Sequence, residues 1–221
     1  MLEKLRELNP GLDISDVGSE TFRTYGRILP YVELKQMAQF VRSTPMPEDE
    51  YYCPLSEELM ESEEAEMITR YVFGGVPCQI GYYNGRVTEL NALEYHKCSE
   101  VLYLLEDVVL LVAHIWEMDS DQLDSSCIKA FYVPKNSCVE LYATTLHYAP
   151  CMAGPEGARQ IVVQSLGTNT DMDQSASDQN GENRLLYQKN KWLIVHPEAE
   201  ALVKAGGYIG ITGENLKVRY L

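Results

Sequence analysis

Two glutamates and a histidine lie within seven residues of one another in the segment LEYHKCSEVLYLLED, residues 93–107. Residues two apart on a strand point to the same face, so Glu94 and His96 would share one side of a strand. Glu100 would lie roughly 13 Å beyond His96 if the strand continued straight. Metal ligands lie about 2.0–2.2 Å from a shared ion. The three side chains can therefore meet at one ion only if the chain reverses at residues 97–99.

Residue types at this position favour such a reversal. Lys97, Cys98 and Ser99 are polar or small, and the strand-like run Val-Leu-Tyr-Leu-Leu begins directly after Glu100. A hairpin here would bring Glu100 back opposite His96. Imidazoles and carboxylates together form a mixed nitrogen and oxygen shell that suits Mn, Fe, Zn, Co or Ni. We therefore predict a divalent metal ion as cofactor, with positions left open for water or substrate.

The pattern Glu94-x-His96-x-x-x-Glu100, followed by an apolar strand, resembles the first motif of the cupin superfamily. That motif runs His-x-His, three or four residues, Glu, then an apolar strand and usually a turn glycine. Glu94 stands where the motif has its first histidine, and Asp107 stands about where the glycine belongs. A carboxylate also binds divalent ions, so the first departure leaves the resemblance in place.

A second segment, VELYATTLHYAPC at residues 139–151, resembles the second cupin motif, Pro-x-Gly-x-x-His followed by Asn. His147 stands at the histidine, and no Asn follows at the usual place. The resemblance implies that the metal ligands are Glu94, His96, Glu100 and His147. The whole chain is also similar to a family of bacterial cupin-like proteins associated with sugar catabolism.

Glu140 is a candidate catalytic residue on the predicted strand that precedes His147. If Val139 and Leu141 face the core, Glu140 points away from it. If Glu140 points into the barrel instead, it is a candidate general base or a ligand that replaces Glu94. The alternation of the strand leaves both placements open.

The remaining histidines and the cysteines have simpler interpretations. His114 shares a predicted strand face with apolar residues and is expected to be a core histidine with satisfied hydrogen bonds. His196 precedes a proline at a predicted helix start and is expected to be a loop or cap residue. The six cysteines are scattered without a CxxC pair, which favours reduced thiols over disulfides or a zinc site.

Residues 76–221 contain short segments rich in Val, Ile, Leu and Tyr, separated by polar turns, as is typical of β-sandwiches and barrels. With the resemblance, this predicts a mainly β fold, a cupin-like double-stranded β-helix (jelly-roll barrel). Residues 1–75 are expected to form a helical or irregular segment packed on the barrel, with helices over 33–43 and 56–73. The acidic stretch 167–183 is expected to be a mobile loop of the barrel.

Turn-forming residues predict several connections. The stretch 44–54 is polar and contains prolines, so we expect a connector there. The dipeptide Asn84-Gly85, between apolar and β-branched flanks, predicts the turn of a hairpin. Residues 184–196 predict another hairpin, and residues 196–207 predict a short helix that ends at two glycines.

Charge and motif content exclude several classes of function. The formal net charge of −15 argues against nucleic acid and anionic membranes as partners, because both would repel the protein. No apolar run has the length of a membrane span, and the charged N-terminus lacks the apolar core of a signal peptide, so we expect a cytoplasmic protein. GxSxG, P-loop and GxGxxG motifs are absent from the sequence. Triad hydrolysis, nucleotide hydrolysis and Rossmann redox chemistry therefore have no support from it.

The predicted function is that of a metal-dependent cupin-type enzyme acting on a small carbohydrate or sugar acid. The resemblance favours an isomerase or epimerase that works through an enediolate, with a sugar-like small molecule as its partner and a homodimer as a possible assembly. Two alternatives stay open. One is a cupin that binds a metabolite without turnover, and the other is an iron-dependent cupin dioxygenase.

Overall fold

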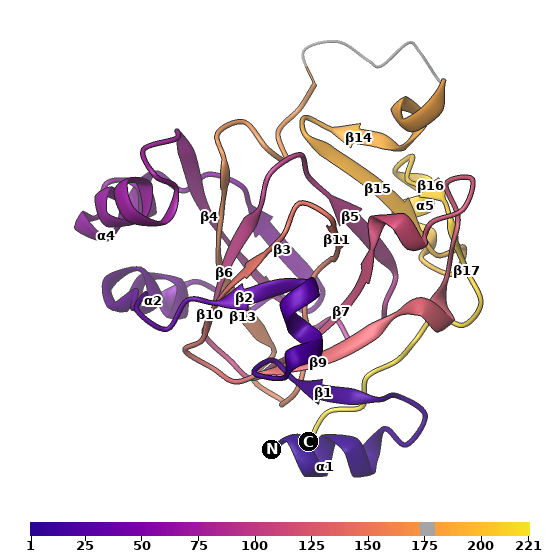
Figure 1. Ribbon diagram of the computed structural model, residues 1–221. Coiled ribbons are helices and arrows are strands. Elements are labelled where there is room, and N and C mark those ends of the chain that lie inside the picture. The colour runs from indigo at the N-terminus through magenta and orange to yellow at the C-terminus, as the bar shows by residue number, and fades with distance from the viewer. Residues whose placement is uncertain (173–179) are drawn as a thin grey trace.

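The computed structural model of the chain describes residues 1–172 and 180–221. Two β-sheets face each other, as Figure 1 shows. Apolar side chains of both sheets pack between them. This arrangement confirms the predicted mainly β, jelly-roll architecture. The part of the predicted acidic loop that spans residues 173–179 lies outside the described residues.

The larger sheet carries one side of the candidate site. Its strands, in spatial order, are β2 (Gly26–Ile28), β10 (Cys138–Leu141), β6 (Glu100–Leu104), β13 (Ala158–Ser165), β4 (Cys78–Gly85) and β3 (Glu50–Cys53). The neighbouring strands pair antiparallel throughout this sheet.

The opposing sheet is built around β7 (Val108–His114). Its strands, in spatial order, are β1 (Ile14–Asp16), β9 (Lys129–Val133), β7 and β11 (Thr145–Leu146), and β12 (Cys151–Met152) also pairs with β7. The β1–β9 pairing is parallel, whereas β7 pairs antiparallel with its neighbours.

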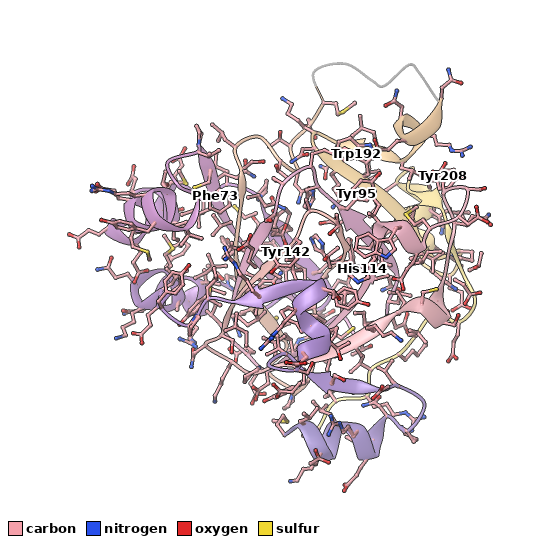
Figure 2. The ribbon with its side chains drawn as sticks, viewed as in Figure 1. Phe73, Tyr95, His114, Tyr142, Trp192 and Tyr208 are labelled. Carbon is pink, nitrogen blue, oxygen red and sulfur yellow. The ribbon has the colours of Figure 1, made fainter. Side chains whose placement is uncertain are left out.

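A third sheet joins the middle of the chain to its C-terminal region. β5 (Ala92–Tyr95) and β14 (Leu186–Gln188) pair antiparallel with β15 (Lys191–Val195), and β16 (Tyr208–Ile209) pairs parallel with β15. Tyr95 stacks on Trp192 across the β5–β15 pair, with ring centroids 5.5 Å apart (Figure 2). β17 (Ile211–Thr212) and β8 (Leu123–Asp124) form a separate parallel pair. The segment with the candidate ligands is therefore held by residues far along the chain.

Strand β6 shows why the larger sheet forms. All five of its residues are buried. Leu102 and Leu104 face the other sheet, whereas Val101 and Tyr103 pack on the opposite side against the N-terminal helices. Alternate residues of a strand point to opposite faces, so a continuous apolar run suits a strand that is covered on both sides.

The helices cover the outer face of the larger sheet and the ends of the molecule. They are α1 (Leu2–Leu8), α2 (Lys35–Ser43), α3 (Glu57–Met60), α4 (Glu63–Met67) and α5 (Glu200–Lys204). α2 and α4 lie beside the larger sheet in Figure 1, and α2 buries Met37, Ala38 and Val41 there. None of the helices in the described parts of the chain is both long and apolar enough to span a membrane.

The N-terminal region differs in part from the prediction. The helices expected over 33–43 and 56–73 are present, although the second is divided, because Ser56 and Ser62 each cap a separate short helix. The prediction of a helical or irregular segment left out three strands, β1, β2 and β3, which extend the two facing sheets. β3 lies within the stretch 44–54 that we expected to be only a connector. The division of the chain at residue 75 stays a prediction.

The hairpin turn predicted at Asn84-Gly85 is wrong, because both residues lie within β4. The Asn84 side chain donates hydrogen bonds to the Thr44 hydroxyl (2.7 Å) and the Pro45 carbonyl (3.0 Å). These tertiary contacts replace the local turn that the dipeptide favours. The hairpin of 184–196 and the helix before the paired glycines are confirmed by the β14–β15 pair and α5.

Candidate metal centre

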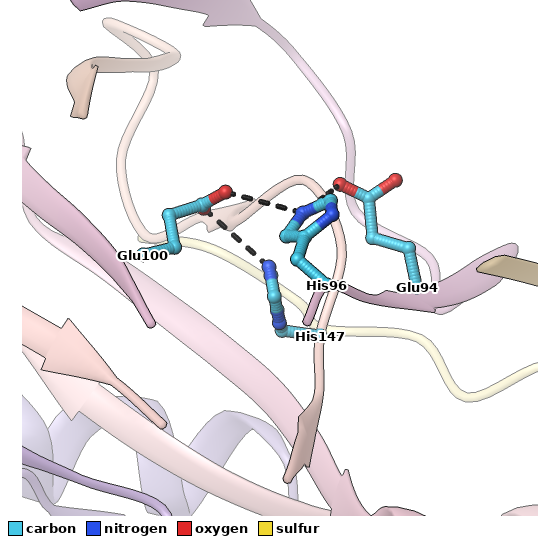
Figure 3. A group of neighbouring side chains, drawn as sticks. All are labelled: Glu94, His96, Glu100 and His147. Atoms are coloured by element: carbon cyan, nitrogen blue, oxygen red, sulfur yellow. Dashed lines mark ion pairs between the residues drawn. The ribbon is translucent and has the colours of Figure 1, made fainter. Parts of the chain in front are cut away.

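The structure brings Glu94, His96, Glu100 and His147 together. Each is buried, and each offers one ligand atom such that the four atoms lie within 4.8 Å of one another. Figure 3 shows the side chains converging from separate stretches of backbone. The His96 Nε2 atom lies 3.5 Å from Glu94 Oε1 and 3.4 Å from Glu100 Oε2. The His147 Nε2 atom lies 3.4 Å from Glu100 Oε1.

The chain reverses between His96 and Glu100, as the sequence predicted, but the reversal is not a hairpin. β5 pairs with β15, whereas β6 pairs with β10 and β13, so the two flanking strands belong to different sheets. The reversal therefore joins two sheets. Glu100 begins β6 and His96 follows β5, which brings their side chains within 3.4 Å.

A backbone bridge holds the other two members of the cluster. The Glu94 N–H donates to the His147 carbonyl (2.6 Å), and the His147 N–H donates to the Glu94 carbonyl (3.0 Å). This reciprocal pair fixes the spacing of the two residues across strands. Residues that face each other in an antiparallel pair place their side chains on the same face.

Both imidazoles are oriented by backbone carbonyls. His96 Nδ1 contacts the Asn190 carbonyl at 2.7 Å, and His147 Nδ1 contacts the Thr145 carbonyl at 2.9 Å. A carbonyl oxygen only accepts, so each Nδ1 carries a proton and directs Nε2 toward the cluster. His147 Nε2 is buried without a hydrogen-bond partner in the described residues. An orphaned imidazole nitrogen beside two carboxylates fits a divalent metal ion such as Mn, Fe, Zn, Co or Ni.

Within the cluster, the pKa values of the two carboxylates and of His96 depend on the charges of their neighbours. Burial lowers the pKa of His96, but hydrogen bonds to Glu100 and Glu94 outweigh it and raise that pKa to about 10. Burial raises the pKa of Glu94, but Lys191 and the two histidines outweigh it and lower that pKa to about 2. Burial also raises the pKa of Glu100, but the two histidines outweigh it and hold that pKa well below its usual range. The carboxylates are therefore ionised and available as ligands.

Gln164 on β13 supports the cluster and was missed in the sequence. Its amide donates to Glu100 Oε2 and lies 3.2 Å from His96 Nε2, and its carbonyl accepts from the Tyr52 hydroxyl at 2.9 Å. Gln164 is 1% exposed. A glutamine inside the apolar run of a central strand is the signal that could have found it, since buried amides need specific partners.

A cavity of about 150 Å³ opens beside the cluster. Besides Glu94, Glu100 and His147, its walls include Glu50, Tyr52, Tyr83, Tyr148 and Lys191. Lys191 forms an ion pair with Glu94 and is 8% exposed. Sequence reasoning did not single out Glu50 or Lys191, because both reach the cavity through strand pairings that local patterns do not reveal.

Glu50 lies at the mouth of this cavity. It is exposed as a residue, but its carboxylate accepts hydrogen bonds from the hydroxyls of Tyr83 (3.3 Å) and Tyr148 (3.5 Å). Loss of solvation raises the pKa of the Glu50 carboxyl above its ordinary value. Burial also raises the pKa of both tyrosines, so their hydroxyls stay protonated and act as donors.

The structure places Glu140 outside the cluster. Glu140 lies opposite Val101 in the β10–β6 register, and Val101 packs on the helix-covered face of the sheet. Glu100 lies one residue before Val101 and therefore faces the other side. The Glu140 carboxylate instead forms an ion pair with Arg27 at 2.7 Å. Of the two placements that the sequence left open, the one that points Glu140 away from the barrel interior is observed.

The two remaining histidines lie apart from the cluster. The expectation that His114 has satisfied hydrogen bonds is met only at Nε2, which contacts the Thr24 hydroxyl, because its Nδ1 is buried without a partner among the described residues. His114 is stacked between Tyr25 and Trp116, with ring centroids 4.0 Å away on each side. His196 Nε2 contacts the Gly213 carbonyl at 3.2 Å, and its Nδ1 accepts from the Glu198 N–H. Both serve the packing and hydrogen bonding of the surrounding loops.

Comparison with known families gives one match. The family described as "Domain of unknown function (DUF4867)" matches residues 14–216. The chain belongs to this family. The DUF4867 match includes all four clustered residues and every residue of the cavity wall. A search of the curated proteins found no match.

Several solved structures share part of the chain's arrangement. HygX from Streptomyces hygroscopicus, with nickel and 2-oxoglutarate bound, is 13% identical with a TM-score of 0.42, over 73% of this chain and 92% of that one. Oxalate decarboxylase from Bacillus subtilis is 11% identical with a TM-score of 0.34, over 79% and 42%. Fe(II)-HppE is 13% identical with a TM-score of 0.29, over 39% and 42%. The chain spans less than half the length of the last two, and no activity transfers at these values.

Proposed function

We propose that this protein is a metal-dependent enzyme that acts on a small carbohydrate or sugar acid, as an isomerase or epimerase in carbohydrate metabolism. The observation that carries the proposal is the buried set of two imidazoles and two carboxylates, of which Glu94, Glu100 and His147 line a cavity. A buried pocket in which a few polar groups converge is the usual setting of an active site.

In this proposal Glu94, His96, Glu100 and His147 hold a divalent ion. Four protein ligands leave coordination positions for substrate oxygens. When bound, such an ion supplies Lewis-acid polarisation of a substrate carbonyl. Gln164 keeps Glu100 oriented through its amide, and the carbonyls of Asn190 and Thr145 keep the imidazoles in the ligating tautomer.

Glu50 has the position of a proton-transfer residue in this proposal. It faces the cavity, whereas Glu140 lies on the other face of the larger sheet. A carboxylate with a raised pKa is a more effective base near neutral pH than an ordinary one. Glu50 takes a proton from the carbon next to the carbonyl and returns it to the neighbouring carbon. The hydroxyls of Tyr83 and Tyr148 orient its carboxylate between the two transfers.

The test is conversion by metal-loaded protein. The purified protein is stripped with chelator, reloaded separately with Mn, Fe, Zn, Co and Ni, and incubated with a panel of aldoses, ketoses and uronates in D₂O. We expect one metal and substrate pair to give product, with deuterium at the carbon that loses its proton. Glu50→Gln should lower the rate by about 10²–10⁴, the usual contribution of a general base. Glu140→Gln, matched in chemistry, should leave it unchanged.

Three other outcomes would contradict the proposal. No conversion, together with a ligand-induced rise in melting temperature, would indicate a metabolite-binding protein without turnover. Oxygen consumption with Fe(II) and substrate would indicate a dioxygenase. A loss of turnover in Glu140→Gln but not in Glu50→Gln would assign proton transfer to the outer face of the sheet.

A further inference from the structure

Lys191 is a buried cation in the wall of the cavity. It begins β15, is 8% exposed, and pairs with Glu94, which β15 holds through the β5–β15 register. Its ammonium lies 5.6 Å from the Tyr148 ring centroid and 6.0 Å from that of Tyr187. Aromatic faces stabilise a cation without neutralising it.

The ammonium group of Lys191 has unused donor capacity. An ammonium has three N–H donors. Among the described residues, the Glu94 carboxylate is the one ion-pair partner of Lys191. Buried donors without acceptors are costly, so the remaining N–H groups favour a ligand that supplies acceptor oxygens.

A bound divalent ion would strengthen the preference of Lys191 for an anionic ligand. The ion would be coordinated by the same Glu94 carboxylate that forms the ion pair with Lys191. Glu94 and Glu100 together carry two negative charges, which a divalent ion balances, so the charge of Lys191 would be left over. Glu50 offsets part of it, but from the cavity mouth and with a carboxyl whose pKa is raised. A buried excess of positive charge is stabilised by an anion.

The size of the cavity limits what that anion can be. An engineered cavity of about 150 Å³ holds one benzene, which has about six non-hydrogen atoms. The cavity beside the cluster has a volume of about 150 Å³, so it admits a fragment of that size and not a whole hexose. Glu50 and Tyr148 also line a second, outer cleft of about 540 Å³, which has room for the remainder of a longer molecule.

We propose that Lys191 binds the carboxylate of the substrate, which makes the substrate a hydroxy acid or sugar acid and not a neutral sugar. Its acid end occupies the inner cavity, and any longer chain passes between Glu50 and Tyr148 into the outer cleft. This inference rests on the proposed function, because it assigns the substrate class of the same metal-loaded site.

The experiment compares two probes of nearly equal size, one anionic and one neutral. Binding of lactate and of its neutral amide, lactamide, to protein loaded with one Mn²⁺ per chain is measured by calorimetry. We expect lactate to bind at least tenfold more tightly than lactamide. Lys191→Gln should abolish this preference, whereas Lys204→Gln, at an exposed lysine paired with Glu200, should retain it. Equal affinities in the unsubstituted protein, or a preference that survives Lys191→Gln, would overturn the inference.

A crystal structure of the lactate complex answers the same question if Lys191→Gln no longer holds the metal. A lactate carboxylate oxygen about 2.7–3.2 Å from Lys191 Nζ supports the proposal, and a carboxylate elsewhere overturns it. Failure of the proposed enzymatic function would look different. In that case Mn²⁺ would not bind, or lactate would bind with the expected preference while no member of the substrate panel is converted.

Discussion

Two buried histidine sites in this protein differ in what surrounds the imidazole. His96 and His147 direct Nε2 toward two carboxylates, and their rings lie 5.4 Å apart. His114 is also buried, but aromatic rings cover both of its faces and its Nε2 contacts the Thr24 hydroxyl at 3.2 Å. His114 is the last residue of β7 and is labelled in Figure 2. Burial alone therefore does not produce a metal site.

The pKa values of the two sites move in opposite directions. At His96, the neighbouring carboxylates outweigh burial and raise the pKa to about 10. At His114, burial dominates and lowers the pKa, with Glu117 opposing it. The comparison shows that a positive charge is favoured at one imidazole and disfavoured at the other. A site that stabilises a proton between carboxylates is also one that a metal cation can occupy.

The largest expected contrast is in metal binding. His96→Ala should lower the affinity for the preferred divalent ion by more than about 100-fold, beyond the effect of an outer supporting residue. His114→Ala should keep one metal per chain and instead lose about 1–3 kcal/mol of stability, because the aromatic stack loses its centre. Elemental analysis and denaturant unfolding measure the two effects. Metal loss in His114→Ala with retention in His96→Ala would reverse the comparison.

Metal removal should affect stability through the cluster alone. An ion at 100 times its dissociation constant stabilises the folded state by about 2.7 kcal/mol. We expect chelation to lower the melting temperature of the unsubstituted protein and of His114→Ala by similar amounts, and to leave that of His96→Ala unchanged. Thermal unfolding with and without chelator measures this, and an equal shift in all three proteins would place the ion elsewhere.

The supporting residues should show a smaller contrast. Gln164→Leu removes the amide that contacts Glu100 and His96, and we expect metal affinity to fall about 10–100-fold. Thr24→Val removes the hydroxyl that contacts His114 and should leave metal affinity unchanged. Metal titration by calorimetry measures both variants. Equal affinities in the two would show that the Gln164 contacts have no bearing on the ion.

The smallest effect concerns pH and is measured on metal-free protein. The folded pKa of His114 is lowered, so the unfolded chain takes up a proton at this residue first as the pH falls through about 6.5. Stability from this residue is therefore present above that pH and lost below it. His114→Phe, which keeps an aromatic ring in the stack, should lose less stability than the unsubstituted protein between pH 7 and pH 5. Parallel pH profiles would remove His114 as the cause.

The sequence predicted the cluster better than its surroundings. The spacing of Glu94, His96 and Glu100 limited the geometry to a reversal, because no straight strand brings these side chains together. Their convergence with His147 was implied by the resemblance of residues 139–151 to the second cupin motif. Their role as metal ligands stays a proposal, while the suitability of the cluster for a metal is confirmed by its geometry.

Other features depend on register between distant strands, which the sequence does not reveal. Gln164 and Lys191 reach the site because β13 lies beside β6 and β15 lies beside β5. The face occupied by Glu140 was open for the same reason, since alternation gives two faces without saying which is inside. The strand β3, which carries Glu50, is four residues long and was hidden in a polar stretch. Such short strands are stabilised by their neighbours more than by their own residues.

The pairing of β5 with β15 also has a consequence for biosynthesis. Glu94 lies opposite Leu193 in this pairing. The part of the cavity wall that β15 contributes can therefore form only after this strand has emerged from the ribosome. Contacts between residues far apart in the chain form late in folding, because a long loop must close first. A nascent chain that ends before β15 therefore lacks a complete pocket, and ion capture should follow translation of this region.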